Sequence, residues 1–339
     1  MQLKNSLIVA SLFVIIFITF WEIYSRANGY IAVVNDDKAL WAVNRAKVDH
    51  ATANDVVIIG SSRAHFDIQL DEWEKAAGVR PIMLASDGTV PAPVLKDIVE
   101  NTGYKGTLLI GVTPGLFFSP PHDSIFVWRR AQVRNDFFHK RTYAQRLNHV
   151  FSVPLQHTFA FLNASEEEWA DDIDLKSLLK RVQIGNRTGP KPPPFYNFQS
   201  VDLDRNVTMF EKVVTDTAFA GTIKKVWMFF GKNAPPPVKK EVLDYYTPLI
   251  KKFEDRGGTV IFSRFPSSGG FREGERIGLP RNEYWDLLLK ETGVPGYHFE
   301  DYDVLNQFYT PEWSHLATPD AKIYTREFVK ILQNDGFLK

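Results

Sequence analysis

The sequence predicts an α/β domain with a mainly parallel sheet between two helical layers, preceded by a membrane-spanning helix. The apolar run Val56–Ile59 ends at Gly60, as expected of a strand that is buried on both faces. Further apolar runs then alternate with helical patterns, which indicates βαβ units and a parallel sheet.

The N-terminal segment predicts a membrane anchor. Residues 6–21 carry no charge, and with their flanking residues they reach about the minimum length that crosses a bilayer. Lys4 precedes the run, whereas Glu22 and Arg26 after it cancel, so the positive-inside rule places the N-terminus in the cytoplasm. The alternative is a cleaved signal peptide, with small residues at the ends of residues 25–27. We expect a single-pass protein of the inner (cytoplasmic) membrane with a periplasmic, extracytoplasmic main domain.

The strands and helices follow in order from the same patterns. The helix after the first strand ends at Gly78, and the next helix carries a proline in its first turn, where proline is tolerated. We expect strands at residues 56–59, 81–85, 107–112, 226–230, 259–262 and 297–299, and helices at about residues 68–77, 91–101, 238–256, 282–292 and 319–333.

The chain divides into an anchor, a linker and one large domain. Residues 1–27 are expected to form a cytoplasmic stub and the anchor, residues 28–54 a linker with a helix, and residues 55–335 the α/β domain. The alternating pattern stops near Pro114, and the aromatic-rich stretch of about 114–223 is too long for one structureless loop. We therefore expect a large, partly helical insertion that forms a cap or lid beside the site.

The composition argues against several functions. The 40 Lys and Arg residues balance 40 Asp and Glu residues, and no basic run is present, so nucleic acid is not an expected partner. The chain has no cysteine, which rules out disulfides, Cys-ligated metals and a thiol nucleophile. The histidines lack metal-ligand spacing, and no phosphate loop or dinucleotide fingerprint occurs, so we expect no metal and no cofactor.

Two short blocks carry candidate chemistry. Ser61 and Ser62 follow the first strand, at the carboxyl edge of the sheet where ligands of parallel sheets bind. The alternative is that these serines only cap the following helix. Near the other end, Glu312 precedes His315 by three residues, so its carboxylate can hold the imidazole in the orientation required by a Ser-His-acid triad.

The order of these blocks resembles the SGNH/GDSL hydrolase superfamily. That family has Gly-Asp-Ser after its first strand and Asp-x-x-His-Leu before its last helix. Here the first block reads Gly60-Ser61-Ser62, with the nucleophile at Ser62, and the last reads Glu-Trp-Ser-His-Leu, with Glu312 in the usual Asp position before His315. The resemblance covers most of residues 55–335 outside the insertion. It implies a flavodoxin-like three-layer sandwich.

The middle blocks of the family match less completely. The family's second-block glycine donates a backbone N–H to an oxyanion, and Gly88 is its counterpart. The third block is normally Gly-x-Asn, but residues 111–113 read Gly-Val-Thr, so the Asn is absent. The resemblance implies an oxyanion hole of the Ser62 and Gly88 N–H groups with the Thr113 hydroxyl. Loss of one donor costs about 3 kcal/mol of transition-state stabilisation, which argues against strong, free-standing hydrolysis.

Two further positions lie after the strand at 259–262. Arg264 and Ser267 are expected at the same sheet edge, where Arg264 would bind an anionic or polyhydroxylated substrate; the alternative is a surface ion pair. His65, one helical turn after Ser62, is expected in a supporting or exposed position.

The resemblance implies a serine-type esterase or O-acyltransferase. Ser62 would attack an ester, His315 would act as base and then acid, and Glu312 would orient His315. Single-pass SGNH-like proteins resemble accessory components of cell-envelope polysaccharide acylation, in which a multi-spanning membrane acyltransferase supplies the acyl group. We therefore expect O-acetyl transfer to, or removal from, a cell-envelope polysaccharide. Two alternatives stay open: a catalytically weak scaffold that binds glycan or the membrane acyltransferase, and a stand-alone extracytoplasmic esterase or lipase.

Overall fold

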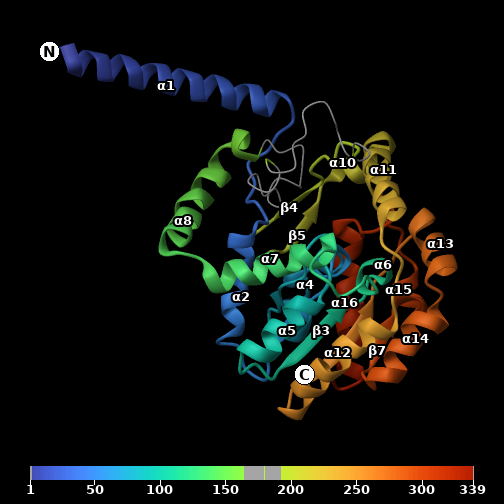
Figure 1. The fold of residues 1–339 in the computed structure, drawn as a ribbon. Helices are drawn as coiled ribbons and strands as arrows, with labels where there is room; N and C mark the ends of the chain where they lie inside the picture. Colours follow the sequence, from blue (N-terminus) through green and yellow to red (C-terminus); the bar gives the residue numbers. More distant parts are fainter. Residues whose placement is uncertain (1, 164–178, 180–191, 339) are drawn as a thin grey trace.

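The centre of the molecule is a five-stranded parallel sheet, seen in the computed structural model, which describes residues 2–163, 179 and 192–338 (Figure 1). Every neighbouring pair of strands is parallel. The order is β2 (Ile82–Met83), β1 (Val56–Ile59), β3 (Thr107–Gly111), β6 (Thr259–Arg264) and β7 (Gly296–His298). Counted along the chain, this is the order 2-1-3-4-5 of a doubly wound sheet. The prediction of an α/β domain with a mainly parallel sheet is confirmed.

Helices cover both faces of the sheet, because successive strand side chains point to opposite sides. In β1, Val57 and Ile59 pack into one core, and Val56 and Ile58 pack into the other. The first core is covered by α2 (Lys38–Val48), α5 (Ala92–Asn101), α7 (Phe126–Lys140), α12 (Lys240–Asp255) and α14 (Arg281–Thr292). The second is covered by α3 (Ser62–Asp67), α4 (Leu70–Ala77), α15 (Asp303–Asn306) and α16 (Thr318–Asn334).

Most predicted helices and strands lie within a few residues of their expected bounds. The helix expected at 68–77 is α4, which ends at Gly78 in the left-handed conformation (φ 71°), and α3 precedes it. The strand expected at 81–85 is shorter, and α13 (Gly269–Gly278) was not predicted. Short segments α6 (Pro114–Phe117) and η3 (Phe299–Asp301) follow β3 and β7.

The stretch after β3 is mainly helical among its described residues. It contains α8 (Tyr143–Thr158), η1 (Ala160–Asn163), the hairpin β4 (Gln199–Val201) and β5 (Val207–Met209), α10 (Glu211–Thr215) and α11 (Thr217–Asn233). The strand predicted at 226–230 is wrong, because these residues lie in α11. Asp216 caps that helix with its carboxylate, and the buried residues Ala220, Ile223 and Val226 recur at helical spacing.

The N-terminal helix α1 (Gln2–Ala27) stands out from the body (Figure 1). Leu3–Ala27 has a mean hydropathy of 2.3 in its most apolar window, none of which is buried, so it is long and apolar enough to cross a membrane. Within the described residues, its C-terminal end is hydrogen-bonded to the body. Glu22 accepts hydrogen bonds from the N–H groups of Ala160 (3.0 Å) and Phe161 (3.2 Å), and Arg26 donates to the Thr158 carbonyl (3.1 Å).

Candidate functional site

The carboxyl edge of the sheet gathers the predicted chemical residues around β1 and β3. The strand order reverses between these two strands, which is where doubly wound sheets leave a crevice. Ser62 begins α3 directly after β1, and Thr113 follows β3. Gly111 allows this close approach, since a Cβ there would lie 2.7 Å from the Cβ of Ala64 in α3.

The acid and histidine of the last block are paired as predicted. Glu312 Oε1 accepts hydrogen bonds from His315 Nδ1 (2.9 Å) and from the His315 backbone N–H (2.6 Å), while Oε2 accepts one from Trp227 Nε1. Burial alone would raise the pKa of the Glu312 carboxyl, but the charge and hydrogen bonds of His315 and the bond from Trp227 hold that pKa below its usual range. A carboxylate at Nδ1 leaves Nε2 as the basic nitrogen of a neutral His315.

The imidazole of His315 is held between aromatic rings. Phe66 stacks on it at 4.2 Å between ring centroids, Phe198 stacks at 6.0 Å, and Trp227 meets it edge to face with the centroids 5.8 Å apart. Nε2 is buried and has no hydrogen-bond partner among the described residues. The structure therefore does not join Ser62 Oγ to His315 Nε2 by a hydrogen bond.

Ser61 and Thr113 form a second pair beside this centre. Their hydroxyl oxygens lie 2.5 Å apart, and Ser61 is almost fully buried whereas Ser62 is partly exposed. Ser61 makes no side-chain capping bond to α3, so the capping alternative is wrong for this serine. If Ser61 donates to Thr113, the Thr113 proton is free for another acceptor; in the opposite orientation it is used.

Gly88 lies in a turn that is fixed from three sides. Its φ of 60° is left-handed, and a Cβ there would meet Arg130 Nη1 at 2.9 Å. Arg130 donates to the carbonyl of the preceding residue, Asp87 (2.8 Å). The Asp87 carboxylate contacts His65 Nδ1 (3.1 Å) and accepts a bond from Gln199 (2.6 Å).

His65 is fully buried between Asp87 and the backbone of Arg205. Its Nε2 donates to the Arg205 carbonyl (2.9 Å), and its Nδ1 faces the Asp87 carboxylate. Burial would raise the pKa of Asp87, but the hydrogen bond and charge of His65 lower it well below its usual range. Arg205 in turn pairs with Asp36 (2.5 Å). The exposed position that the sequence left open for His65 is thus wrong, because the side chain is fully buried.

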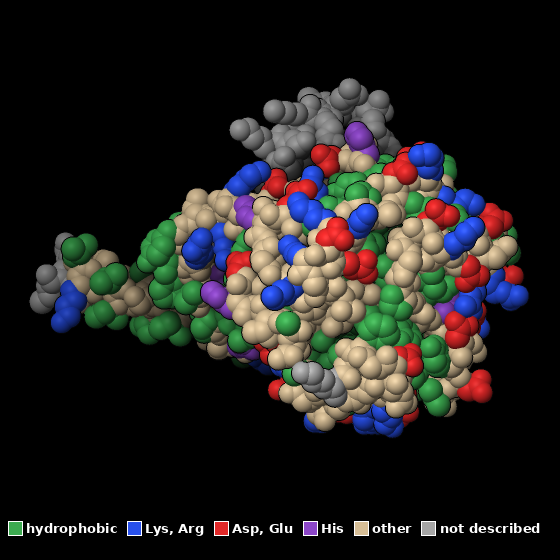
Figure 2. All heavy atoms as spheres, turned by 90° about the horizontal axis from the view of Figure 1, so that it is seen from below, with side chains coloured by type: hydrophobic (Ala, Val, Ile, Leu, Met, Phe, Trp, Pro, Cys, Tyr) green, Lys and Arg blue, Asp and Glu red, His purple; other side chains and the backbone are tan. Residues whose placement is uncertain are grey.

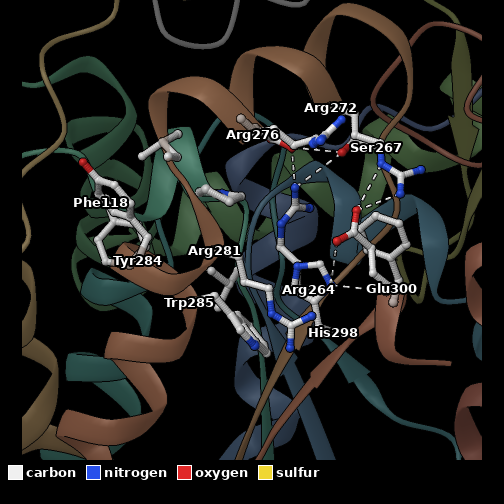
Figure 3. A pocket seen from close by; sticks show the side chains of 15 residues that line it. Phe118, Arg264, Ser267, Arg272, Arg276, Arg281, Tyr284, Trp285, His298 and Glu300 are labelled. Carbon is white, nitrogen blue, oxygen red and sulfur yellow. Dashed lines mark hydrogen bonds and ion pairs between the residues drawn. The ribbon is translucent and has the colours of Figure 1, made fainter.

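Arg264 is buried in an ion-pair network and is not free at the surface (Figure 3). It pairs with Glu275 and donates to the Phe265 carbonyl (2.6 Å), and Ser267 donates to Glu275 (2.9 Å). Burial lowers the pKa of Arg264 to about 10, against the opposing effect of Glu275. The surface ion pair expected as an alternative is thus a buried one.

Arg63 carries the same network toward Ser62. Its Nη2 forms an ion pair with Glu275 Oε1 (2.7 Å). Arg63 Nε donates to Ser314 (3.2 Å), the residue before His315. Two buried guanidinium groups, Arg63 and Arg264, therefore share the carboxylate of Glu275.

The loop that carries Glu312 is seated on two glycines. Trp313 has a left-handed φ of 81°, and a Cβ on Gly269 or Gly270 would come within 2.3 Å or 2.9 Å of its indole ring. Ser268 N–H donates to the Trp313 carbonyl (3.0 Å), and Thr310 N–H donates to Ser268 Oγ (2.8 Å). The segment after β6 thus holds the acid loop in place.

Two cavities lie away from Ser62 and His315. One of about 50 Å³ is lined by Arg264, Ser267 and their neighbours in α13 and α14 (Figure 3). The other, of about 320 Å³, lies at the amino end of the sheet beside Val56 and Trp73. Neither is lined by Ser62 or His315. In the part of the chain that the structure describes, no group of three or more metal-binding side chains occurs.

Several supporting residues were not predicted from the sequence. Trp227, Asp87, Gln199 and Arg130 hold Glu312 or the Gly88 turn, and none belongs to a recognisable motif. The one sequence feature that pointed to Trp227 was the concentration of aromatic residues in the segment 192–233. The chain matches no model of a known protein family and no curated protein.

Proposed function

We propose that this chain is an SGNH-like enzyme of the serine type, anchored by α1, that transfers or removes an acyl group at Ser62. The observation that carries the proposal is the His315 imidazole, bound at Nδ1 by a buried Glu312 and left without a partner at Nε2. An imidazole used only for packing would cost free energy by leaving a buried polar nitrogen unpaired. A general base requires that nitrogen to be free for the proton of a nucleophile.

The proposed reaction begins with attack of Ser62 Oγ on an ester carbonyl. His315 Nε2 takes the Ser62 proton, and the imidazolium is stabilised by the carboxylate of Glu312. The N–H groups of Ser62 and Gly88, with the Thr113 hydroxyl when Ser61 donates to it, hold the oxyanion. His315 then returns the proton to the leaving alcohol, and the acyl group passes to water or to a sugar hydroxyl.

The substrate follows from the resemblance and from the anchor, and so belongs to the proposal. An SGNH-like domain tethered to the inner membrane on its outer side is suited to O-acetyl groups of a cell-envelope polysaccharide. A multi-spanning acyltransferase in the same membrane would supply the acyl group.

A second candidate is a weakly catalytic scaffold for a glycan or a membrane acyltransferase. Two observations favour it. No hydrogen bond joins His315 Nε2 to Ser62, and the Thr113 hydroxyl is already paired with Ser61. A stand-alone esterase remains the third alternative, and it predicts turnover of simple esters without an acceptor.

The test is labelling of the full chain in detergent by a serine-directed fluorophosphonate, followed by intact mass. The full chain is needed because Glu22 and Arg26 bind the body. We expect labelling of the wild type and its loss in Ser62→Ala and His315→Ala. Ser61→Ala removes the partner of the Thr113 hydroxyl but not the proposed nucleophile, so it should slow labelling without abolishing it. Thermal unfolding establishes that each variant is folded.

Each result separates the candidates. A folded wild type that is never labelled contradicts the enzyme and supports the scaffold. Loss of label in Ser61→Ala but not in Ser62→Ala would show that Ser61, and not Ser62, is the nucleophile. Release of acetate from acetyl esters, with and without an acetylatable oligosaccharide, then distinguishes hydrolysis from transfer.

A further inference from the structure

Helix α8 turns its apolar side away from the body. None of its 16 residues is buried. Its apolar side chains recur at helical spacing and therefore share one face. Their exposed fractions are 75% for Tyr143, 36% for Leu147, 61% for Val150, 67% for Phe151 and 49% for Leu155.

The opposite face of α8 meets the body and is more polar. His149, Ser152, Val153 and Gln156 are its partly buried residues. Gln156 accepts a hydrogen bond from the backbone N–H of Asn35 (3.0 Å). A surface helix in water normally buries its apolar face and exposes its polar one. The reversed arrangement requires a second apolar environment on the outer side of α8.

The position of α1 indicates which neighbour supplies this apolar environment. The segment directly after α8 is bonded to the end of α1, through Glu22 to Ala160 and Phe161. In Figure 1, α8 lies on the side of the body from which α1 extends, and it runs across the direction of α1. Figure 2 shows hydrophobic side chains that continue from α1 onto the adjoining side of the body. A bilayer crossed by α1 would meet this side.

The charges around α8 fit a lipid surface. Residues 137–163 contain no Asp or Glu, whereas they include Lys140, Arg141 and Arg146. Acidic residues return in the sequence at Glu166. A helix with a continuous apolar face and nearby cations is typical of segments that lie in the membrane interface, where cations attract anionic headgroups.

We propose that α8 lies in the interface of the bilayer that α1 crosses. Its apolar face would sit among the upper acyl chains, with Lys140, Arg141 and Arg146 at the headgroups. The occupant of this face is thus lipid, because the face is continuous with the anchor. The proposal does not depend on the chemistry proposed for Ser62.

The test measures the depth of α8 in the full chain, reconstituted into vesicles of phosphatidylcholine and phosphatidylglycerol. Because the chain has no cysteine, one introduced cysteine carries one label. An environment-sensitive fluorophore is placed at Val150 or Leu155, and at Gln145 as the exposed control on the polar side. We expect the labels at 150 and 155 to emit at shorter wavelength, to be quenched by lipid-attached nitroxide and to be shielded from iodide. The label at 145 should show the reverse.

Three outcomes would overturn the proposal. Iodide access at 150 and 155 equal to that at 145 would place α8 in water. Shielding that disappears when the lipid-to-protein ratio is raised would identify a second copy of the chain as the occupant. Shielding in native membranes but not in vesicles of purified protein would identify a different membrane protein.

Discussion

Trp227→Phe removes the indole N–H that Glu312 Oε2 accepts, while keeping an aromatic ring in α11. Glu312 is fully buried, so that oxygen cannot recover its lost bond from bulk water. A hydrogen bond to a charged group is worth about 1.5–3 kcal/mol, and we expect a loss of unfolding free energy of that size. Labelling of Ser62 should also slow, because Glu312 then holds His315 less firmly.

A matched control exists elsewhere in the core. Trp73 is also fully buried, but its indole N–H has no hydrogen-bond partner among the described residues. Trp73→Phe therefore costs only ring contacts and removes an unpaired donor. Denaturant unfolding of both variants, each also combined with Glu312→Gln, gives the coupling between Trp227 and Glu312 directly. A coupling near zero, or the same coupling for Trp73, would refute the reasoning.

Three further predictions concern the surroundings of the same site. Gly269→Ala should cost about 2–4 kcal/mol, because it strains a left-handed φ and strikes the Trp313 ring, whereas Gly274→Ala, with open space, should be neutral or slightly stabilising; thermal unfolding compares them. Glu275→Gln leaves two buried guanidinium groups without their carboxylate and should lower the free energy of unfolding by about 3–5 kcal/mol. Glu327→Gln, in an exposed ion pair, should lower it by at most about 1 kcal/mol. Denaturant unfolding compares the two, and equal losses would contradict the buried network. The pKa of Glu312 is lower in the folded than in the unfolded state, so its carboxylate stabilises the fold above the unfolded-state pKa of about 4, and this stabilisation is lost as the pH falls below that value. The melting temperature should therefore drop on acidification, and drop less in Glu312→Gln. Parallel profiles for the two proteins would contradict this.

The central sheet could be predicted because its strands are buried on both faces. A continuous apolar run such as Val56–Ile59 has few other structural explanations when helical patterns flank it. The run at 226–230 has the same appearance but is helical. Its helix is specified by Asp216, ten residues earlier, and by packing against distant rings, which a short window does not contain.

The centre of the site could be predicted for a different reason. Glu312 and His315 are three residues apart, so their pairing is local, and the parallel sheet brings Ser62 and Thr113 to one edge. The supporting contacts are not local. Trp227 reaches Glu312 across 85 residues and Arg205 reaches His65 across 140, and no sequence pattern encodes such distances.

The junction between α1 and the body has a mechanical consequence. A domain joined to its anchor by a flexible linker samples many heights and tilts above a membrane. Here Glu22 of α1 accepts hydrogen bonds from the first residues of η1, and Arg26 of α1 donates one to the last residue of α8. The end of α1 is therefore bonded directly to the body. The domain is then held at a fixed angle to α1 and does not move freely on a linker. If α1 crosses a bilayer, turning it about its axis would turn the whole domain with it, so the orientation of α1 would set which face of the domain meets the membrane surface.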